Sequence, residues 1–231
     1  MADYRSEEEQ IEILKKWWQE NGRSMVAGVC IALVGYFGWA WWHGYQQSKI
    51  EAAADLYQQM VPSRQEGAQP LDKTRVTAIA EQLRKDYPGT VYAIFASLHL
   101  SKEAVAAKDF PRAIELLNWA SDHKPDAALI PLLRLRTAQV QYAQAQYDVA
   151  LATLSEVKDS GAWKSDFSEL RGDLLLAQGK ADLAREAYAD ALKALDESGT
   201  PERRQNIEMK QADATQSTQA LPTPAVTGGK T

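Results

Sequence analysis

One long stretch without formal charge limits the fold of this chain more than any other feature. Between Arg23 and Lys49 there are 25 residues without a single Lys, Arg, Asp or Glu. Its apolar core runs from Met25 to Trp42 (MVAGVCIALVGYFGWAWW), and as a helix it would be about 27 Å long at ~1.5 Å per residue. A bilayer has a hydrocarbon core about 30 Å thick. The sequence therefore predicts a single transmembrane helix at residues 24–46.

Two other interpretations of this stretch fit less well. A buried core helix can be equally apolar, but rarely over such a length without a charge. A cleaved signal peptide has a shorter apolar region that ends in small residues, whereas this one ends in Trp41-Trp42-His43-Gly44-Tyr45. We therefore expect an uncleaved signal anchor. Aromatic rings favour the headgroup region, and six of them are predicted to mark the two membrane interfaces: Trp17, Trp18, Trp39, Trp41, Trp42 and Tyr45.

The basic residues around the span predict its orientation. Four precede it and two follow it closely: Arg5, Lys15, Lys16 and Arg23, then Lys49 and Arg64. The positive-inside rule then places the N-terminus in the cytoplasm and the bulk of the chain on the other side. Residues 1–23 are predicted to form an amphipathic helix that begins at a Ser6–Glu9 capping box and stops at Asn21-Gly22. It would lie on the membrane surface or dock a cytoplasmic partner.

Composition excludes several classes of function. The net charge of -5 argues against nucleic-acid binding, which needs a basic surface. A single cysteine excludes an intrachain disulfide and the usual Cys/His zinc sites. Neither G-x-S-x-G, a P-loop nor H-E-x-x-H occurs, and His43, His99 and His123 have no nucleophile beside them in sequence. We expect no enzyme, no cofactor and no metal site.

Residues 47–211 are predicted to be an all-α domain of antiparallel helical hairpins, because apolar residues recur at helical spacing. Helix breakers divide this region into helices of twelve to eighteen residues. The breakers are Pro62 to Pro70, Tyr87-Pro88-Gly89, Pro125, Ser160-Gly161 and Gly199-Thr200-Pro201. A polar helix from Thr200-Pro201 to about Gln211 would cover the open end. Residues 212–231 are expected to be disordered.

An internal repeat runs through this domain. The segments that begin at Lys108, Ala145 and Gly179 align, at spacings of 37 and 34 residues. Small residues are needed where two helices cross closely, with larger ones beside them. The packing set comprises Ala113, Leu117, Ala120, Ala150, Leu154, Gly172, Gly179, Ala184, Tyr188 and Ala191. The pattern resembles the tetratricopeptide repeat, a 34-residue helix–turn–helix unit. A degenerate unit, Ile50 to Met60 and Asp72 to Tyr87, is predicted to precede the three.

The first helix of each unit is predicted to line a groove for a polypeptide partner. By the repeat register the groove residues are Phe95, Leu98, Lys102 and Val105, then Leu132, Leu135, Gln139 and Tyr142, then Asp166, Glu169 and Asp173. Such a groove would be apolar in two units and acidic in the third, and would suit a segment with apolar and basic residues. The alternatives are that the leucines belong to the core and that the carboxylates form a solvated face.

The whole chain resembles the YfgM family, the tetratricopeptide-like ancillary subunit of the bacterial SecYEG translocon. The most specific stretch is SEEEQIEILKKWWQENG, residues 6–22, followed directly by the glycine-rich span. The resemblance implies a single-pass protein of the bacterial inner membrane with a periplasmic repeat domain. Its implied partners are the SecYEG translocon, a membrane-anchored prolyl-isomerase-like periplasmic chaperone, exported polypeptides and the lipid bilayer.

The implied role is to help newly exported proteins pass from the channel to periplasmic chaperones. Two other roles use the same parts. The chain could be a scaffold for another envelope complex, or a tether that holds a stress-response regulator through its cytoplasmic helix. The residues themselves predict the anchor, the orientation and the helical array. The translocon follows only from the resemblance.

Overall fold

The computed structural model describes residues 7–61, 72–195 and 199–219, and every regular element in these ranges is a helix. The predicted all-α class is therefore confirmed. The chain divides into two compact units, residues 1–54 and 55–231.

Helix α1 (Glu7–Gln58) is one uninterrupted helix of 52 residues, about 78 Å long at ~1.5 Å per residue. Residues 9–58 form a helix long and apolar enough to cross a membrane, with a mean hydropathy of 1.6 in its most apolar window, none of which is buried. Within the first unit the helix carries the charge-free run on its exposed surface.

The predicted helix stop at Asn21-Gly22 is wrong. The Asn21 side-chain amide donates to the Trp17 carbonyl oxygen at 3.2 Å, inside the helix. Gly22 lies against the Trp18 indole, where an added Cβ would approach the ring to 3.3 Å. Gly22 therefore makes room for an aromatic ring on the same helix, and its φ is not positive. Local spacing cannot distinguish this use of glycine from a left-handed helix end.

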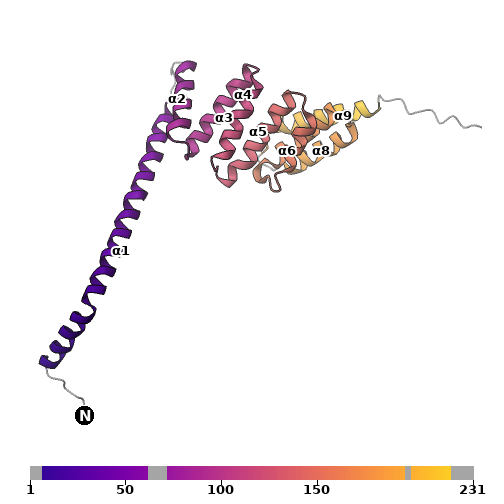
Figure 1. Cartoon of the computed structure of the whole chain (residues 1–231). Helices are drawn as coiled ribbons and strands as arrows, with labels where there is room; N and C mark the ends of the chain where they lie inside the picture. Colours follow the sequence, from indigo (N-terminus) through magenta and orange to yellow (C-terminus); the bar gives the residue numbers. More distant parts are fainter. Residues whose placement is uncertain (1–6, 62–71, 196–198, 220–231) are drawn as a thin grey trace, which may run out of the picture. The chain divides into compact units, whose positions relative to one another are not determined.

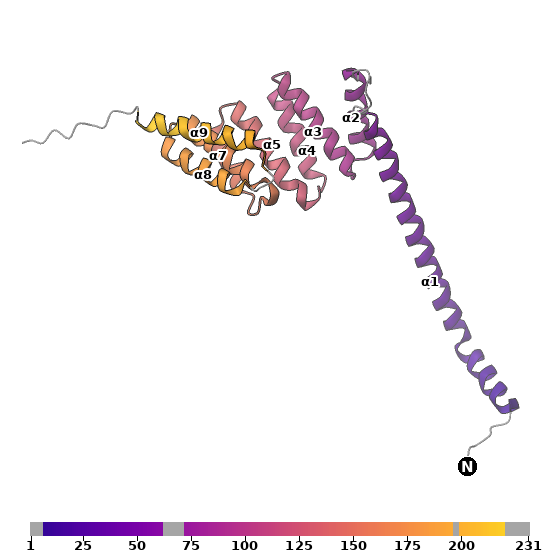
Figure 2. The same cartoon turned by 180° about the vertical axis from the view of Figure 1, so that it is seen from behind.

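In the second unit each helix packs beside the helices of that unit that precede and follow it in the chain (Figures 1 and 2). They are α2 (Lys73–Asp86), α3 (Val91–Ala106), α4 (Phe110–Asp122), α5 (Ile130–Ala143), α6 (Tyr147–Ser155), α7 (Lys164–Ala177), α8 (Ala181–Ala194) and α9 (Pro201–Gln219). Short 3₁₀ turns, η1 (Ala127–Leu129) and η2 (Gly161–Trp163), precede α5 and α7. Helix α6, with nine residues, is shorter than the predicted minimum of twelve.

Local capping explains where several helices begin. The Thr90 hydroxyl accepts from the Ala93 N–H at 3.3 Å at the start of α3. The Asp109 carboxylate accepts from the Arg112 N–H at 3.1 Å at the start of α4, where Pro111 occupies the first turn. Side-chain oxygens satisfy helix N–H groups that have no partner within the helix, and a proline there loses no hydrogen bond.

The three hairpin turns have the same geometry. Lys108, Ala145 and Gly179 take positive φ angles of 60°, 58° and 75° at equivalent places. In each turn the next N–H returns to a carbonyl five residues earlier: Asp109 to Ala104 at 2.8 Å, Gln146 to Gln141 at 2.9 Å and Lys180 to Leu175 at 2.9 Å. This is a Schellman helix end. The 37- and 34-residue spacings of the sequence repeat are therefore the separations in sequence between successive copies of the same turn.

Small and large side chains alternate where the paired helices cross. Ala113, Ala150 and Ala184 are fully buried, and Leu117, Leu154 and Tyr188 are at most 1% exposed. Gly172 of α7 lies under the Tyr188 ring of α8, where an added Cβ would stand 2.5 Å from Cε1. Only glycine lets α7 and α8 approach this closely around the tyrosine.

Helix α9 continues eight residues beyond the predicted end at Gln211. The reason is an apolar face on an otherwise polar helix: Ile207 and Ala214 are both fully buried and pack in one cluster with Ala184, Tyr188 and Ala191 of α8. A helix that ended at Gln211 would remove Ala214 from that cluster. Residues 220–231 of the predicted tail lie outside the described residues.

Candidate partner-binding groove

A groove of about 480 Å³ lies between α3 and α5, with α4 behind it. We call it the α3–α5 groove. Its lining comprises Leu98, His99, Ser101, Lys102 and Val105 of α3, Leu117 of α4, and Leu132, Arg136, Gln139 and Val140 of α5. Leucine and valine side chains form its apolar surface, and two cations stand among them. A cavity of this size with a few polar groups is typical of a ligand site.

Five residues predicted from the repeat register come together in this groove. Leu98, Lys102 and Val105 lie on one face of α3, at helical steps of four and three, and Leu132 and Gln139 lie on the facing side of α5. The repeat register therefore identified residues on two helices that only the fold brings to one cavity.

Leu135 does not line the groove, so that part of the prediction is wrong. It is 1% exposed and belongs to a core cluster with Ala138 of α5 and with Phe167 and Leu170 of α7. Leu98 occupies the equivalent position one repeat earlier but is only half-buried. The two leucines differ because α7 covers the second, which the repeat register does not encode.

Arg136 and His99 also line the groove and were missed by the sequence reasoning. Arg136 lies four residues after Leu132 and three before Gln139, so helical spacing alone would have placed it on the same face. Its Nη1 donates to the Gln139 side-chain oxygen at 2.9 Å. Among the residues that the structure describes, neither Arg136 nor Lys102 forms an ion pair with a carboxylate.

The three carboxylates of the third unit bind α9, and they are not free to receive a basic partner. Arg203 Nη2 lies 2.8 Å from Asp166 Oδ1, and Lys210 Nζ lies 2.8 Å from both Glu169 Oε1 and Asp173 Oδ2. The carboxylate side chains are only 22–28% exposed. The carboxylates predicted to form the acidic end of the groove therefore bind the C-terminal helix α9 instead.

Buried polar contacts stabilise the packing of α9 on these carboxylates. The Tyr188 hydroxyl donates to Asp173 Oδ1 at 2.8 Å, and burial together with this hydrogen bond raises the pKa of Tyr188 well above its usual value. Burial lowers the pKa of Lys210, but its bonds to Asp173 and Glu169 outweigh that effect, and the pKa is raised. Both groups therefore keep their protons through the physiological range.

The remaining predicted residues lie elsewhere. The Phe95 ring stands 5.8 Å from the Tyr57 ring, and the Tyr142 ring 5.8 Å from the Tyr147 ring, so both pack on aromatic neighbours outside the groove. The six predicted interface aromatics are exposed on α1, each residue being 45–72% accessible. Trp41 stacks on Tyr45, and Lys49 Nζ lies 4.6 Å over that ring. Their place at the membrane interfaces stays a prediction.

Comparison with known proteins supplies the family context. The family model described as a tetratricopeptide repeat-like domain matches residues 15–216. A curated protein of Haemophilus influenzae named ancillary SecYEG translocon subunit is 32% identical, over 91% of this chain and 98% of its own length. A protein of the same name from Aggregatibacter actinomycetemcomitans is 35% identical, over 83% and 91%. The crystal structure of MamA protein has a TM-score of 0.47 at 14% identity, and covers 77% of this chain and 99% of that one.

Proposed function

Because the chain belongs to the YfgM family of ancillary SecYEG translocon subunits, we propose that it is a non-enzymatic adaptor anchored beside the Sec translocon. Its α1 helix would cross the inner membrane once, with the N-terminus in the cytoplasm and the repeat domain in the periplasm. The relatives carry the translocon in their names and align over 91% and 83% of this chain, and the family model matches residues 15–216, from the apolar helix to α9. This similarity over most of both chains carries the proposal.

The α3–α5 groove supports a role in holding exported polypeptides. It combines apolar side chains with polar ones at the surface of a helical array, which suits a short segment of an unfolded or newly translocated chain. A membrane-anchored prolyl-isomerase-like chaperone would then receive that segment. Covalent linkage to α1 would confine the repeat domain to the membrane that holds the channel, so that a weak contact would act at a raised effective concentration.

Co-purification tests the association. A tagged chain is extracted from membranes in a mild detergent, and the proteins that accompany it are identified. Translocon subunits and a periplasmic chaperone in near-stoichiometric amounts are the expected result. Cell-wall enzymes or a cytoplasmic regulator in their place would overturn the proposal and favour an envelope scaffold or a regulator tether.

Two further experiments separate the parts. Deletion of residues 1–20 with the anchor retained removes any cytoplasmic docking site; if it reproduces the phenotype of a full deletion, the regulator tether gains support. Protease added to spheroplasts tests the orientation. Loss of a C-terminal tag is expected, and its protection would reverse the proposed topology.

A further inference from the structure

The α3–α5 groove presents positive charge in a chain whose net charge is -5. Lys102 and Arg136 lie on its two walls, on α3 and α5, and both side chains are exposed. Within the described residues neither forms an ion pair. The groove is thus a local cationic site on an acidic protein.

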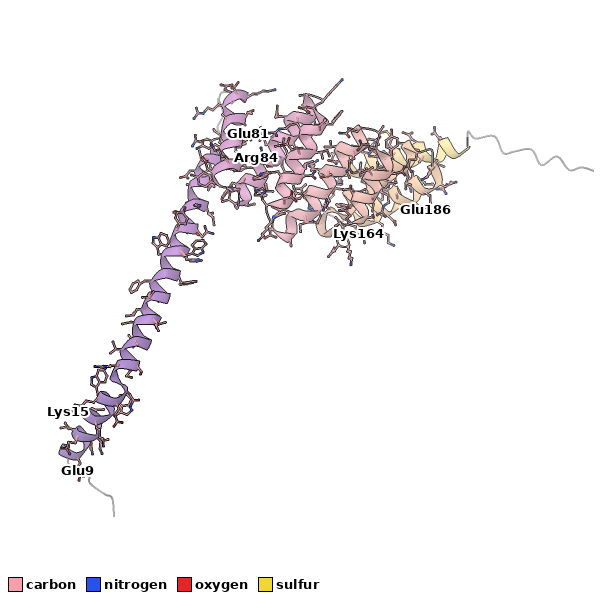
Figure 3. All side chains as sticks on the ribbon, viewed as in Figure 1. Glu9, Lys15, Glu81, Arg84, Lys164 and Glu186 are labelled. Atoms are coloured by element: carbon pink, nitrogen blue, oxygen red, sulfur yellow. The ribbon has the colours of Figure 1, made fainter. Side chains whose placement is uncertain are left out.

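Several arginines at helix contacts elsewhere in the repeat domain have carboxylate partners, although Arg75 donates to the neutral Gln59 amide at 3.5 Å. Arg112 pairs with Glu81 of α2 at 2.9 Å, and Glu81 is labelled beside Arg84 in Figure 3. Arg134, on α5 itself, pairs with Glu156 at 3.3 Å. Arg136 lies two residues further along the same helix, and among the described residues its side chain donates only to the neutral Gln139 amide. A bound partner can therefore supply the carboxylate that pairs with Arg136.

The geometry of Arg136 suits recognition of a carboxylate. Its Nη1 is held by Gln139 at 2.9 Å, which limits rotation of the guanidinium plane and leaves the remaining N–H groups to donate elsewhere. Arginine forms paired, directional hydrogen bonds with carboxylates, whereas lysine acts as a more mobile point charge. Lys102 on the opposite wall would receive a second acidic group.

The apolar lining defines the rest of the ligand. Leu98, Val105 and Leu132 are half-buried and face a space of about 480 Å³. That space accommodates one or two large apolar side chains. Burial of such a side chain supplies affinity whatever the charge of the segment, so Lys102 and Arg136 decide which of several apolar segments binds best.

We propose that the α3–α5 groove selects polypeptide segments that carry apolar side chains flanked by carboxylates. This inference rests on the proposed function in assuming that the groove receives a polypeptide, and it names the chemistry of that polypeptide. It reverses the basic preference predicted from the sequence, because α9 neutralises the acidic residues on which that preference depended.

The test measures peptide selectivity on the full-length chain in nanodiscs of zwitterionic lipid. Three fluorescent peptides, blocked at both ends, share two leucines four positions apart and differ in four flanking residues: all Glu, all Gln or all Lys. Fluorescence anisotropy should give the Glu peptide an affinity on the order of tenfold above that of the Lys peptide, with Gln between them. Added salt should weaken only the Glu peptide.

Charge reversal in the groove supplies the matched variant. Lys102→Glu combined with Arg136→Glu should lower the affinity for the Glu peptide on the order of tenfold and make the Lys peptide the better ligand. Both sites are exposed, so an unchanged melting curve is expected. The control is Lys193→Glu on the exposed face of α8, which should alter binding by less than about twofold.

Equal affinities for the three peptides, no binding of any peptide, or wild-type binding by the double variant would each overturn the inference. Translocon co-purification is measured on the same proteins. Peptide selectivity without translocon association would contradict the proposed function alone. Translocon association without selectivity would contradict only the inference.

Discussion

Gly172→Ala tests whether the repeat packing is limited by one close contact. The added Cβ would stand 2.5, 2.6 and 2.9 Å from three atoms of the Tyr188 ring, whereas ordinary contact begins at 3.4 Å. The ring would have to move by roughly 0.9 Å, the difference between 2.5 and 3.4 Å. Tyr188 is 1% exposed, and its hydroxyl is tied to Asp173 at 2.8 Å, so little space is open to it.

Two effects of opposite sign set the magnitude. Alanine improves the helical propensity of α7 by about 1 kcal/mol over glycine. Overpacking costs about 1–3 kcal/mol, and a strained hydrogen bond to a carboxylate adds about 1 kcal/mol. The clash exceeds the gain in propensity, and the free energy of unfolding should fall by about 2 kcal/mol. For a domain of this size the melting temperature falls by about 4–8 °C.

The assay is thermal unfolding of the full-length chain in detergent, followed by circular dichroism. Tyr188→Ala provides the second corner of a double-mutant cycle. With the ring removed, the same Gly172→Ala change should stabilise the protein by about 1 kcal/mol, because only the propensity effect remains. An equal effect of Gly172→Ala in both backgrounds would refute the reasoning that the glycine exists to admit the ring.

Four further predictions follow from the same contacts. Leu135→Glu should abolish cooperative unfolding, because an unpaired carboxylate would be buried in the core at a cost of several kcal/mol; an unchanged melting curve would place the side chain in solvent after all. Lys210→Met should lower the free energy of unfolding by about 1–2 kcal/mol. This is less than the cost of breaking a fully buried ion pair, because the lysine side chain is 36% exposed. Backbone hydrogen exchange should become faster in α9 before it does in α3. Lys108→Gly should raise stability by about 1 kcal/mol by relieving the left-handed φ of 60°, and Gly179→Ala at φ 75° should lower it similarly; equal effects of the two changes would contradict the turn geometry. The raised pKa of Tyr188 contributes stability that is complete below the ordinary tyrosine pKa of 10.0 and is lost as pH rises above it. Tyr188→Phe should therefore reduce the fall in melting temperature at alkaline pH. A wild-type fall no steeper than that of the variant would rule this out.

Features that depend on neighbouring residues could be predicted well. The charge-free run required an exposed apolar helix, and α1 is one. Alignment of Lys108, Ala145 and Gly179 located three turns with the same hydrogen bonds. The caps at Thr90 and Asp109 are equally local, although the sequence analysis did not name them. Each of these features is decided within a few residues.

Features that depend on distant partners could not be predicted in the same way. Leu98 and Leu135 are equivalent in the repeat, but α7 packs on one of them only. Asp166 and Asp173 look like a solvated or partner-binding face until α9, some 37 residues later, brings Arg203 and Lys210 to them. Asn21-Gly22 has the composition of a helix end, yet a neighbouring indole takes the space that the glycine leaves.

The sequence by itself determined the apolar helix, the all-α class and the repeat with its turns, because these arise from hydrophobic spacing and local hydrogen bonds. Only the tertiary structure decided which faces remain open. It covered the acidic face with α9 and buried Leu135 under α7, and it left Lys102 and Arg136 exposed across one groove. The physical reason is that burial and charge pairing are properties of assembled surfaces. A residue acquires them from whichever helix packs beside it, and that helix can be far away in the chain.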